Sequence, residues 1–532
     1  MSIHSTPRRP GRRAGVAAWL AMAAALTAWD AAALLSAQPP APAEPESEEA
    51  VDPADDPALD IIRANVRGMV AAGALQQAAA EVERLIRRDP GSPSSQLLAV
   101  EVYFRLGKDA EVEAHAERAR ALDPASDRPD FWLARLARWR GNFAEARRRL
   151  RRALDRRPRS APLEAELAVL LNADGQRRRA QRLFRRAALG EDADPGVTLD
   201  AALALSDPRR RDRALERLAE RHPDYRAGRA WAALCAAVSG QRLWEAEEWA
   251  GPLEIPLEVE QQHFPVVTVE LDKGVAARLL LDTGSTGLKI SRPLAEALGA
   301  KPFGSLQVTG MGSSRPVFSD LVLIERLRLG GLVVRRVPAT VLDNVPLGEG
   351  LLNPMALGLE AARFDLSRRL LILGDNEQVV PGEGARLAFA DFDQHPLVRL
   401  TLNGRTHLAM IDSGSGATVL DESVVRQIPE RRPMVIEGME FSLSGVLGAV
   451  KDARPVHIAR LALGPVALEN PILFEADLSR FGALLGTDVQ ILFGADFLSR
   501  FDATFDYRRM ELTLAPVAER RRKGVGLKSR SD

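Results

Sequence analysis

The pattern of apolar and polar residues changes period along this chain and divides it into two halves. Between residues 58 and 250, apolar residues recur every three or four positions, as they do from Leu75 to Leu85, which is typical of amphipathic helices. From His263 to about residue 515, apolar and polar residues alternate, which is typical of half-buried strands. We therefore expect a multidomain α + β protein, with an α-helical region first and an all-β region second.

The helical half contains a repeat of 34 residues. Two series keep this interval, one of glycines and one of prolines that follow them by 17 residues: Gly73, Gly107, Gly141 and Gly175, then Pro90, Pro124 and Pro158. Glycine suits the turn between two helices, and proline suits the end of the second helix. A small or β-branched residue lies five positions after each glycine: Ala78, Val112, Ala146 and Ala180. Each repeat is thus predicted to be a helix–turn–helix hairpin.

The period, the small residue after the turn and the closing Asp-Pro pairs make residues 58–190 resemble tetratricopeptide repeats. The pattern then loses its regularity, and residues 196–250 are expected to continue as less regular helices. We assign residues 58–250 to one helical solenoid. The resemblance implies a concave groove that binds a protein partner, or a scaffold that spaces its neighbours.

The first forty residues resemble an export signal. Several arginines precede an uncharged apolar run from Ala14 to Trp29, and small residues follow at 35–37. A signal peptide cleaved after Ala37 is the favoured interpretation, with an uncleaved membrane anchor and a soluble cytoplasmic helix as alternatives. We therefore expect residues 1–37 to send the chain to the periplasm or outside the cell, either free or attached to the membrane.

Two segments are not expected to fold. Residues 38–57 are rich in proline and acidic residues and cannot bury enough apolar surface, so they are interpreted as a disordered linker. Residues 516–532 are interpreted as a basic, disordered tail.

The composition argues against several classes of function. The chain has 72 basic and 72 acidic residues, so its charge gives no reason to expect nucleic-acid binding. Its one cysteine, Cys235, cannot form an intramolecular disulfide or a cysteine-based metal site. The seven histidines are scattered, without a metal-ligand spacing. We expect no metal and no cofactor, so any chemistry must come from other side chains.

The β-rich half contains two hairpins that lead into similar acidic triplets. The first turns at residues 272–274 and its second strand runs into Asp282-Thr283-Gly284. The second turns at residues 403–404 and runs into Asp412-Ser413-Gly414, 130 residues after the first triplet. A short helical stretch follows each triplet, and both halves end in a matching Phe-Asp segment. We interpret this as an internal duplication of one lobe, at residues 262–376 and 390–515.

Each triplet, preceded by apolar residues, resembles the catalytic turn of the aspartic proteases, in particular the compact bacterial retropepsin-like type. The resemblance covers roughly residues 262–515. It implies that Asp282 and Asp412 form a catalytic dyad within one chain. Four neighbouring residues would support the dyad, the hydroxyl groups by interlocking hydrogen bonds and the glycines by their freedom of φ: Thr283, Gly284, Ser413 and Gly414.

The family also has an apolar segment ending in glycine that packs behind each catalytic turn. Residues 491–494 (Ile-Leu-Phe-Gly) fit this segment in the second lobe. In the first lobe the nearest equivalent is residues 350–353, which end in Asn353 instead of glycine. A glycine-rich hairpin tip containing Gly310, Met311 and Gly312 is the candidate for a flap over the cleft, with residues 442–448 as a weaker counterpart. Ordinary surface hairpins are the alternative for both.

The resemblance implies a mechanism as well. One carboxylate would take a proton from water, which attacks the peptide carbonyl, while the other carboxyl donates to the developing oxyanion. Two like charges about 3 Å apart cannot both ionise cheaply, so the pair would share a proton and act best on the acidic side. The expected function is an exported aspartic endopeptidase whose helical repeats position a protein or peptide substrate. A non-catalytic protein-binding scaffold and a self-processing protease that cuts near Gly251-Pro252 are the alternatives.

Overall fold

The computed structural model describes residues 57–517, apart from 72–73, 191–194, 250, 261–262, 309–316, 346, 430, 434–442, 446–447, 451–452, 464 and 479–484. The expected signal or anchor at 1–37, nearly all of the linker at 38–57 and nearly all of the basic tail at 516–532 lie outside the described residues, as do the flap candidates Gly310, Met311 and Gly312. Within the described part of the chain, no helix has the length and apolar character needed to cross a bilayer.

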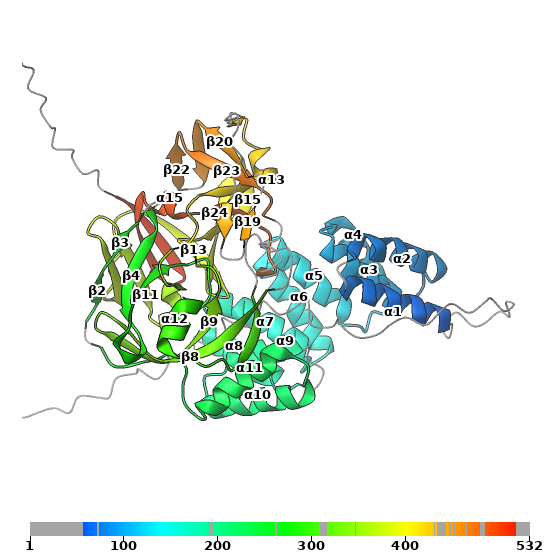
Figure 1. The fold of residues 1–532 in the computed structure, drawn as a ribbon. Helices are drawn as coiled ribbons and strands as arrows, with labels where there is room; N and C mark the ends of the chain where they lie inside the picture. The colour runs from blue at the N-terminus through cyan, green and yellow to red at the C-terminus, as the bar shows by residue number, and fades with distance from the viewer. Residues whose placement is uncertain are drawn as a thin grey trace, which may run out of the picture.

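The first region is a series of packed helices (Figure 1). Their bounds are α1 Pro57–Ala71, α2 Leu75–Arg88, α3 Pro93–Arg105, α4 Asp109–Leu122, α5 Arg128–Trp139, α6 Phe143–Arg156, α7 Ala161–Ala173, α8 Arg177–Ala187, α9 Pro195–Leu203, α10 Pro208–Arg221 and α11 Arg226–Ala237. Three of the repeating glycines, Gly107, Gly141 and Gly175, lie between paired helices with φ between +68° and +70°, where a side chain would be strained. The predicted helical repeats are confirmed.

The predicted end of the helical region is wrong. The last helix ends at Ala237, and the residues that follow contain strands of the β-rich region: β1 Glu245–Ala246, β2 Leu253–Pro256 and β3 Glu258–Val259. Strand β1 pairs with β9, and β2 pairs along its whole length with β12. Strands of two to four residues are too short to show alternation, so the sequence pattern could not place this boundary. The junction near Gly251-Pro252 therefore leads directly into a paired strand.

The first lobe is a barrel of six strands closed on itself. Its strands are β4 Pro265–Glu270, β5 Ala276–Leu281, β6 Leu288–Ser291, β8 Val317–Leu329, β9 Leu332–Leu342 and β10 Gly350–Leu352, with β7 Gly304–Val308 beside β8. The ring runs β4-β5-β10-β6-β9-β8 and returns to β4. A 3₁₀ turn at Asp272–Gly274 joins β4 to β5, and helix α12, Arg292–Leu298, follows β6 and is the short helical stretch predicted after the first triplet.

The second lobe repeats this order around its own triplet. Its elements are β14 His395–Leu402, β15 Arg405–Ile411, β16 Val419–Asp421, α13 Glu422–Val425, β17 Arg431–Pro433, β18 Leu443–Gly445, β19 Gly448–Val450, β20 Arg454–Ile458, β21 Arg460–Leu463, β22 Val466–Glu469, β23 Ile472–Ala476, β24 Val489–Phe493 and α15 Ala495–Leu498. The central strand β24 lies between β15 and β16, as β10 lies between β5 and β6 in the first lobe.

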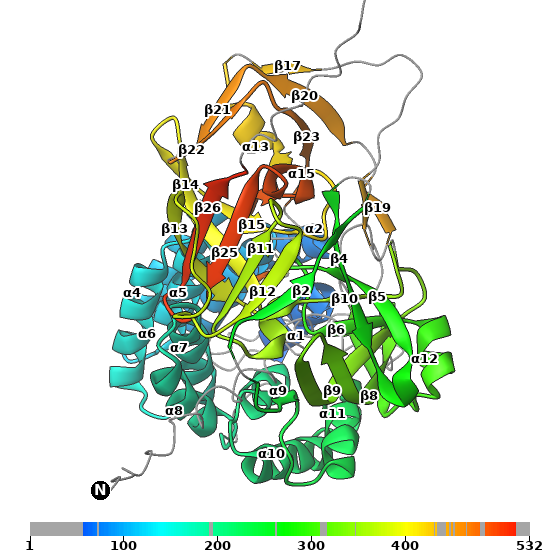
Figure 2. The ribbon, with the colours of Figure 1, turned by 90° about the vertical axis from the view of Figure 1, so that its left-hand side faces the viewer.

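Strands from both lobes form one sheet between them (Figure 2). The strands are β11 Ala361–Asp365, β12 Leu370–Gly374, β13 Ala385–Phe392, β25 Phe501–Asp506 and β26 Glu511–Pro516, in the order β13-β26-β25-β11-β12-β2. Strand β11 of the first lobe pairs with β25 of the second, so the lobes share backbone hydrogen bonds. Strand β13 begins at Ala385, earlier than the predicted start of the second lobe at residue 390.

Helices α5–α11 share a hydrophobic core with both lobes, whereas α1–α4 have a separate core that reaches only to α5. Two turn glycines of the repeats lie against side chains of the second lobe. A Cβ atom on Gly141 would lie 2.9 Å from Leu408, and one on Gly175 would lie 3.0 Å from Met510. Turns of the helical region therefore pack against the second lobe, while helix α11 packs against β7 of the first lobe.

Phe392, at the end of β13, is the centre of this contact. Its ring lies 4.9 Å from the ring of Phe143 on α6, and the guanidinium of Arg138 on α5 stacks over it at 5.1 Å. Arg138 also donates a hydrogen bond of 2.7 Å to the carbonyl of Leu485 in the second lobe. An aromatic ring, a cation and a backbone carbonyl thus join the repeats to the second lobe.

We predict that Phe392→Ala lowers the free energy of unfolding by about 3–5 kcal/mol, because it removes a ring that is 1% exposed from this contact. Phe318→Ala is the matched control, since Phe318 is 47% exposed, and we expect it to cost less than about 1 kcal/mol. Urea denaturation of both variants measures the difference. Equal losses would show that Phe392 is not a main support of the contact.

Candidate active site

Both triplets follow a buried strand that fixes the start of the turn. Strands β5 and β15 each lie between a hairpin partner and a parallel strand, and each delivers an aspartate at its end. The amide of Asp282 donates to the carbonyl of Leu352 at 3.0 Å, and that of Asp412 donates to the carbonyl of Phe493 at 2.9 Å. The strands therefore place the two aspartates in equivalent positions.

The two turns hold each other through four hydrogen bonds. The hydroxyl of Thr283 donates to the carbonyl of Ile411 at 2.7 Å and accepts from the amide of Ser413 at 3.0 Å. The hydroxyl of Ser413 donates to the carbonyl of Leu281 at 2.7 Å and accepts from the amide of Thr283 at 3.0 Å. All four bonds are buried, where an unpaired polar group is costly. Each hydroxyl is thus fully used in joining one lobe to the other.

This joint brings the two carboxyl groups together. A Cβ atom on Gly284 would lie 2.2–2.4 Å from the carboxyl atoms of Asp412, and one on Gly414 would lie 2.3–2.6 Å from those of Asp282. A hydrogen bond joins the two carboxyl groups, and both aspartates are 7% exposed. The turns therefore pack so closely that each glycine leaves the space that the opposite aspartate fills.

The reason expected for these glycines was wrong. We expected them to supply freedom of φ, but neither Gly284 nor Gly414 has a positive φ. Any side chain at these positions would collide with the opposite carboxyl group. The constraint is one of space between the lobes, which a single turn considered alone does not reveal.

Burial and mutual repulsion keep the pair partly protonated. Burial raises the pKa of Asp282, although the charge of Lys289 and the hydrogen bond from the Gly284 amide act in the opposite direction. Burial raises the pKa of Asp412 well above its usual value, and the charge of Asp282 raises it further. The arrangement can hold one carboxylate beside one carboxylic acid, which are the two groups needed to deprotonate water and protonate an oxyanion.

Asn353 supports the first turn, where the sequence led us to expect glycine. Its side-chain amide donates to the carbonyl of Ser285 at 2.7 Å and to that of Gln394 at 3.0 Å. In the second lobe Gly494 stands at this place, and a Cβ there would lie 2.5 Å from the carbonyl of Ala417. The first turn leaves more room behind it, and Asn353 fills that room with hydrogen bonds.

The sequence did not identify a polar turn that contacts the first triplet. Asp393 and Gln394, both with positive φ, form the tip between β13 and β14. The side chain of Gln394 accepts a hydrogen bond of 2.9 Å from the Gly287 amide, and a ring nitrogen of His395 lies 3.1 Å from the Gly284 carbonyl. In the sequence this tip has the polar composition of a surface turn, so nothing marked it as part of the site.

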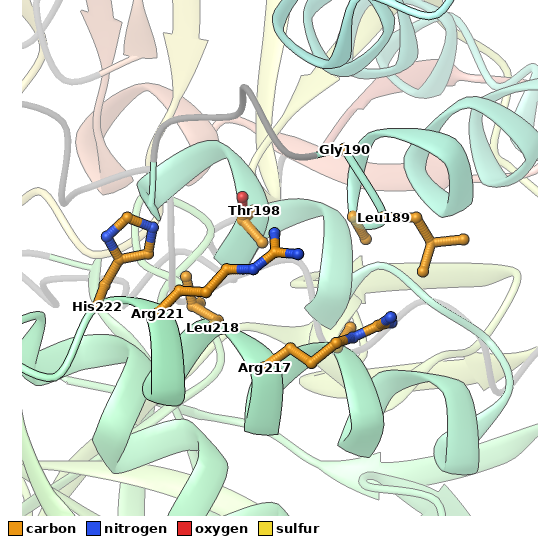
Figure 3. A pocket seen from close by; sticks show the side chains of 9 residues that line it. Leu189, Gly190, Thr198, Arg217, Leu218, Arg221 and His222 are labelled. Carbon is orange, nitrogen blue, oxygen red and sulfur yellow. The ribbon is translucent and has the colours of Figure 1, made fainter.

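A separate pocket lies within the helical region, between α8, α9 and α10 (Figure 3). It is lined by Ala188, Leu189, Gly190, Thr198, Ala214, Arg217, Leu218, Arg221 and His222. No residue of the two triplets lines it, so it is distinct from the candidate dyad. Of the described residues, no group of three or more His, Cys, Asp or Glu side chains is arranged to hold a metal ion.

Comparison with known proteins agrees with this geometry. Residues 267–361 and 398–497 match the family model described as aspartyl protease. These two segments are similar to the aspartyl protease family. Both triplets lie within the matched residues of this aspartyl protease region, as do Asn353 and Gly494.

Two further comparisons were made, with solved structures and with curated proteins. Among solved structures, a thermophilic TPR protein of Thermus thermophilus is similar at 20% identity, covering 34% of this chain and 99% of its own, with a TM-score of 0.29. A search of the curated proteins found no match.

We predict that Thr283→Val destabilises the aspartyl protease region. The change removes one hydroxyl and leaves the Ile411 carbonyl and the Ser413 amide unpaired, at about 1–3 kcal/mol for each buried group. Thr268→Val, on the exposed side of β4, is the control and should change the free energy of unfolding by less than about 0.5 kcal/mol. Chemical denaturation gives both values, and a Thr283 variant as stable as the control would contradict the role of this joint.

A second prediction concerns the buried tip of the β13–β14 hairpin. Burial raises the pKa of Asp393 to about 8, with a smaller contribution from the nearby charge of Asp391. Its Oδ1 has no hydrogen-bond partner among the described residues. The folded chain therefore holds this proton more tightly than the unfolded chain, whose pKa is about 3.9. The resulting stability is complete below the unfolded pKa and is lost as the pH rises toward 8, by up to about 1.4 kcal/mol per pH unit.

Asp393→Asn keeps the group neutral at every pH. We expect its advantage in free energy of unfolding over the parent chain to grow between pH 4 and pH 8. Asp224→Asn, at an exposed position of the helical region, should show no such trend. Denaturation curves at pH 4, 6 and 8 measure the difference, and a pH-independent difference would contradict the raised pKa of Asp393.

Proposed function

We propose that this chain is an exported, single-chain aspartic endopeptidase that hydrolyses peptide bonds with a water molecule activated by Asp282 and Asp412. The observation that carries the proposal is the pair of buried carboxyl groups, joined by a hydrogen bond and held by interlocked turns of one chain. The aspartyl protease family match supports peptidase chemistry in the same residues. On this proposal the two lobes arose by duplication, which their equivalent strand order supports.

The proposed reaction needs only what the pair supplies. The ionised carboxylate takes a proton from water, the resulting hydroxide attacks the peptide carbonyl, and the protonated carboxyl donates to the oxygen as its charge develops. Collapse of the tetrahedral intermediate then breaks the C–N bond and transfers a proton to the leaving amine. Because the pair acts as one unit, its two titrations belong to the pair rather than to either residue.

The helical repeats are proposed to position the protein or peptide substrate for the two lobes. They contact the second lobe through the turn residues Gly141 and Gly175 and through Arg138 of α5, so a chain bound to the repeats would be held at a fixed place relative to the dyad. The N-terminal segment is proposed to export the protein to the periplasm or beyond, with or without a membrane anchor.

We predict that Asp282→Asn and Asp412→Asn each lower the rate of peptide cleavage by at least about a thousandfold, because either change removes one of two groups that act together. The assay is digestion of a mixed peptide library by the chain without residues 1–37, between pH 3 and pH 8. Asp224→Asn serves as the control for preparation and handling, and should cleave like the parent.

Circular dichroism and melting curves of each variant separate loss of chemistry from loss of fold. Cleavage that survives in the Asp282→Asn, Asp412→Asn double variant would assign the activity elsewhere. A folded parent chain that cleaves no library peptide would favour the protein-binding scaffold. A change in its own mass that requires both aspartates would favour self-processing.

A further inference from the structure

The two halves of the site differ at one position that the strand register makes equivalent. In the first lobe Leu351 of β10 pairs with Leu280, two residues before Asp282, and with Lys289 of β6. In the second lobe Leu492 of β24 pairs with Met410, two residues before Asp412, and with Val419 of β16. A lysine on one side of the site therefore corresponds to a fully buried valine on the other.

Lys289 is held against the loop that follows Asp282. Its ammonium nitrogen donates to the hydroxyl of Ser285 at 2.5 Å and to the carbonyl of Thr286 at 2.8 Å. The hydroxyl of Thr286 lies 3.4 Å from the same nitrogen. A flexible side chain fixed by this many acceptors keeps its charge in one place, close to the first triplet.

Three titratable groups face this ammonium. They are Asp282 from the turn after β5, and Asp393 and His395 from the tip between β13 and β14. Burial raises the pKa of Asp393 to about 8, so it is neutral over the acidic range. Burial also lowers the pKa of His395 to about 4, so it is neutral above that pH. Asp282 is therefore the group in this set whose ionised form gains most from the positive charge of Lys289.

Among the described residues, Asp412 has no corresponding cation. The interactions that shift its pKa are burial, the charge of Asp282, and hydrogen bonds with Asp282 and with the amides of Gly414 and Ser415. Val419, which occupies the place of Lys289 in the second lobe, carries no charge. Asp282 accepts one amide hydrogen bond from its own turn and Asp412 accepts two, whereas the charge of Lys289 acts on Asp282.

We propose that Lys289 is a positioning residue that makes the pair unequal: it holds Asp282 as the carboxylate that activates water and leaves Asp412 as the acid that donates to the oxyanion. This inference rests on the proposed peptidase function and assigns the two roles within it. Without a fixed charge beside one member, the shared proton could reside on either oxygen pair. The lysine favours the arrangement with the proton on Asp412 and the charge on Asp282, and continues to favour it as the pH falls.

The first test is the pH dependence of kcat/KM for Lys289→Met, which removes the charge and keeps a similar length of side chain. Loss of the cation raises the pKa of Asp282, so the acidic limb should move to higher pH by about one unit, a tenfold loss of kcat/KM on that limb. Lys289→Arg keeps the charge and should keep the limb within about 0.3 unit of the parent. Lys301→Met, at an exposed lysine, is the control and should not move it. A folded Lys289→Met variant with an unmoved acidic limb would overturn the assignment.

The second test needs no turnover. Equilibrium unfolding at pH 6 gives the coupling of Lys289→Met with Asp282→Asn and, separately, with Asp412→Asn. If Lys289 acts on Asp282, the effect of Lys289→Met on the unfolding constant should change at least tenfold when Asp282 is replaced. It should change less than threefold when Asp412 is replaced. Equal couplings to both aspartates would overturn the inference.

The two tests separate the failure of the inference from that of the proposed function. A folded parent chain that cleaves nothing would refute the peptidase, while the unfolding cycles would still decide whether Lys289 acts on Asp282 selectively. A parent chain that cleaves peptides, together with an unmoved acidic limb and equal couplings, would retain the peptidase and reject the role of Lys289.

Discussion

The structure of the candidate site depends on two hydroxyl groups that each bond to the backbone of the opposite lobe. Thr283 and Ser413 each donate to the opposite lobe and accept from it, which fixes the distance between the turns more tightly than apolar packing alone would. The glycine that follows each hydroxyl is then required by space, because the opposite carboxyl group lies where a side chain would be. Burial raises the pKa of both aspartates, and the nearby charge of Asp282 raises that of Asp412 further, since two buried carboxyl groups in contact cannot both lose their protons cheaply.

The rest of the fold supports this joint from outside. Strands β11 and β25 pair across the lobes, so backbone hydrogen bonds join the two lobes in one sheet. The tip of the β13–β14 hairpin contacts the first turn through Gln394 and His395. Directly before that tip, Phe392 packs against Phe143 of the helical region. A single hairpin thus connects the repeats, the second lobe and the loop after Asp282.

Much of this organisation could be predicted from the sequence, because the signals were periodic or duplicated. The 34-residue interval predicted the helical repeats, and two similar triplets after apolar strands predicted two equivalent lobes. The helix at Arg292–Leu298 was also predictable, since Ser291 caps its start and Gly299 ends it in a left-handed conformation. What these features share is a signal in the sequence itself: a repeated interval, a duplicated motif, or capping residues at the two ends of a helix.

The remaining features depend on contacts between distant segments. Strands β1, β2 and β3 are too short to show a period, and the partners of β1 and β2 lie tens of residues away. Asn353 was read as a departure from the family pattern, and only its contacts with Ser285 and Gln394 explain it. Lys289 has the sequence context of an ordinary strand residue. Its interaction with Asp393 depends on the folded position of the β13–β14 hairpin tip, which the sequence does not show.

The division of the hydrophobic core has a consequence for how such a protein can diversify. Helices α5–α11 share their core with the lobes, so substitutions in them are constrained by the geometry of the site. Helices α1–α4 have a core of their own that ends at α5, and their surfaces can change without disturbing the residues around the triplets. In related chains the outer repeats can therefore vary in sequence, while the inner repeats are constrained by the core that they share with the two lobes.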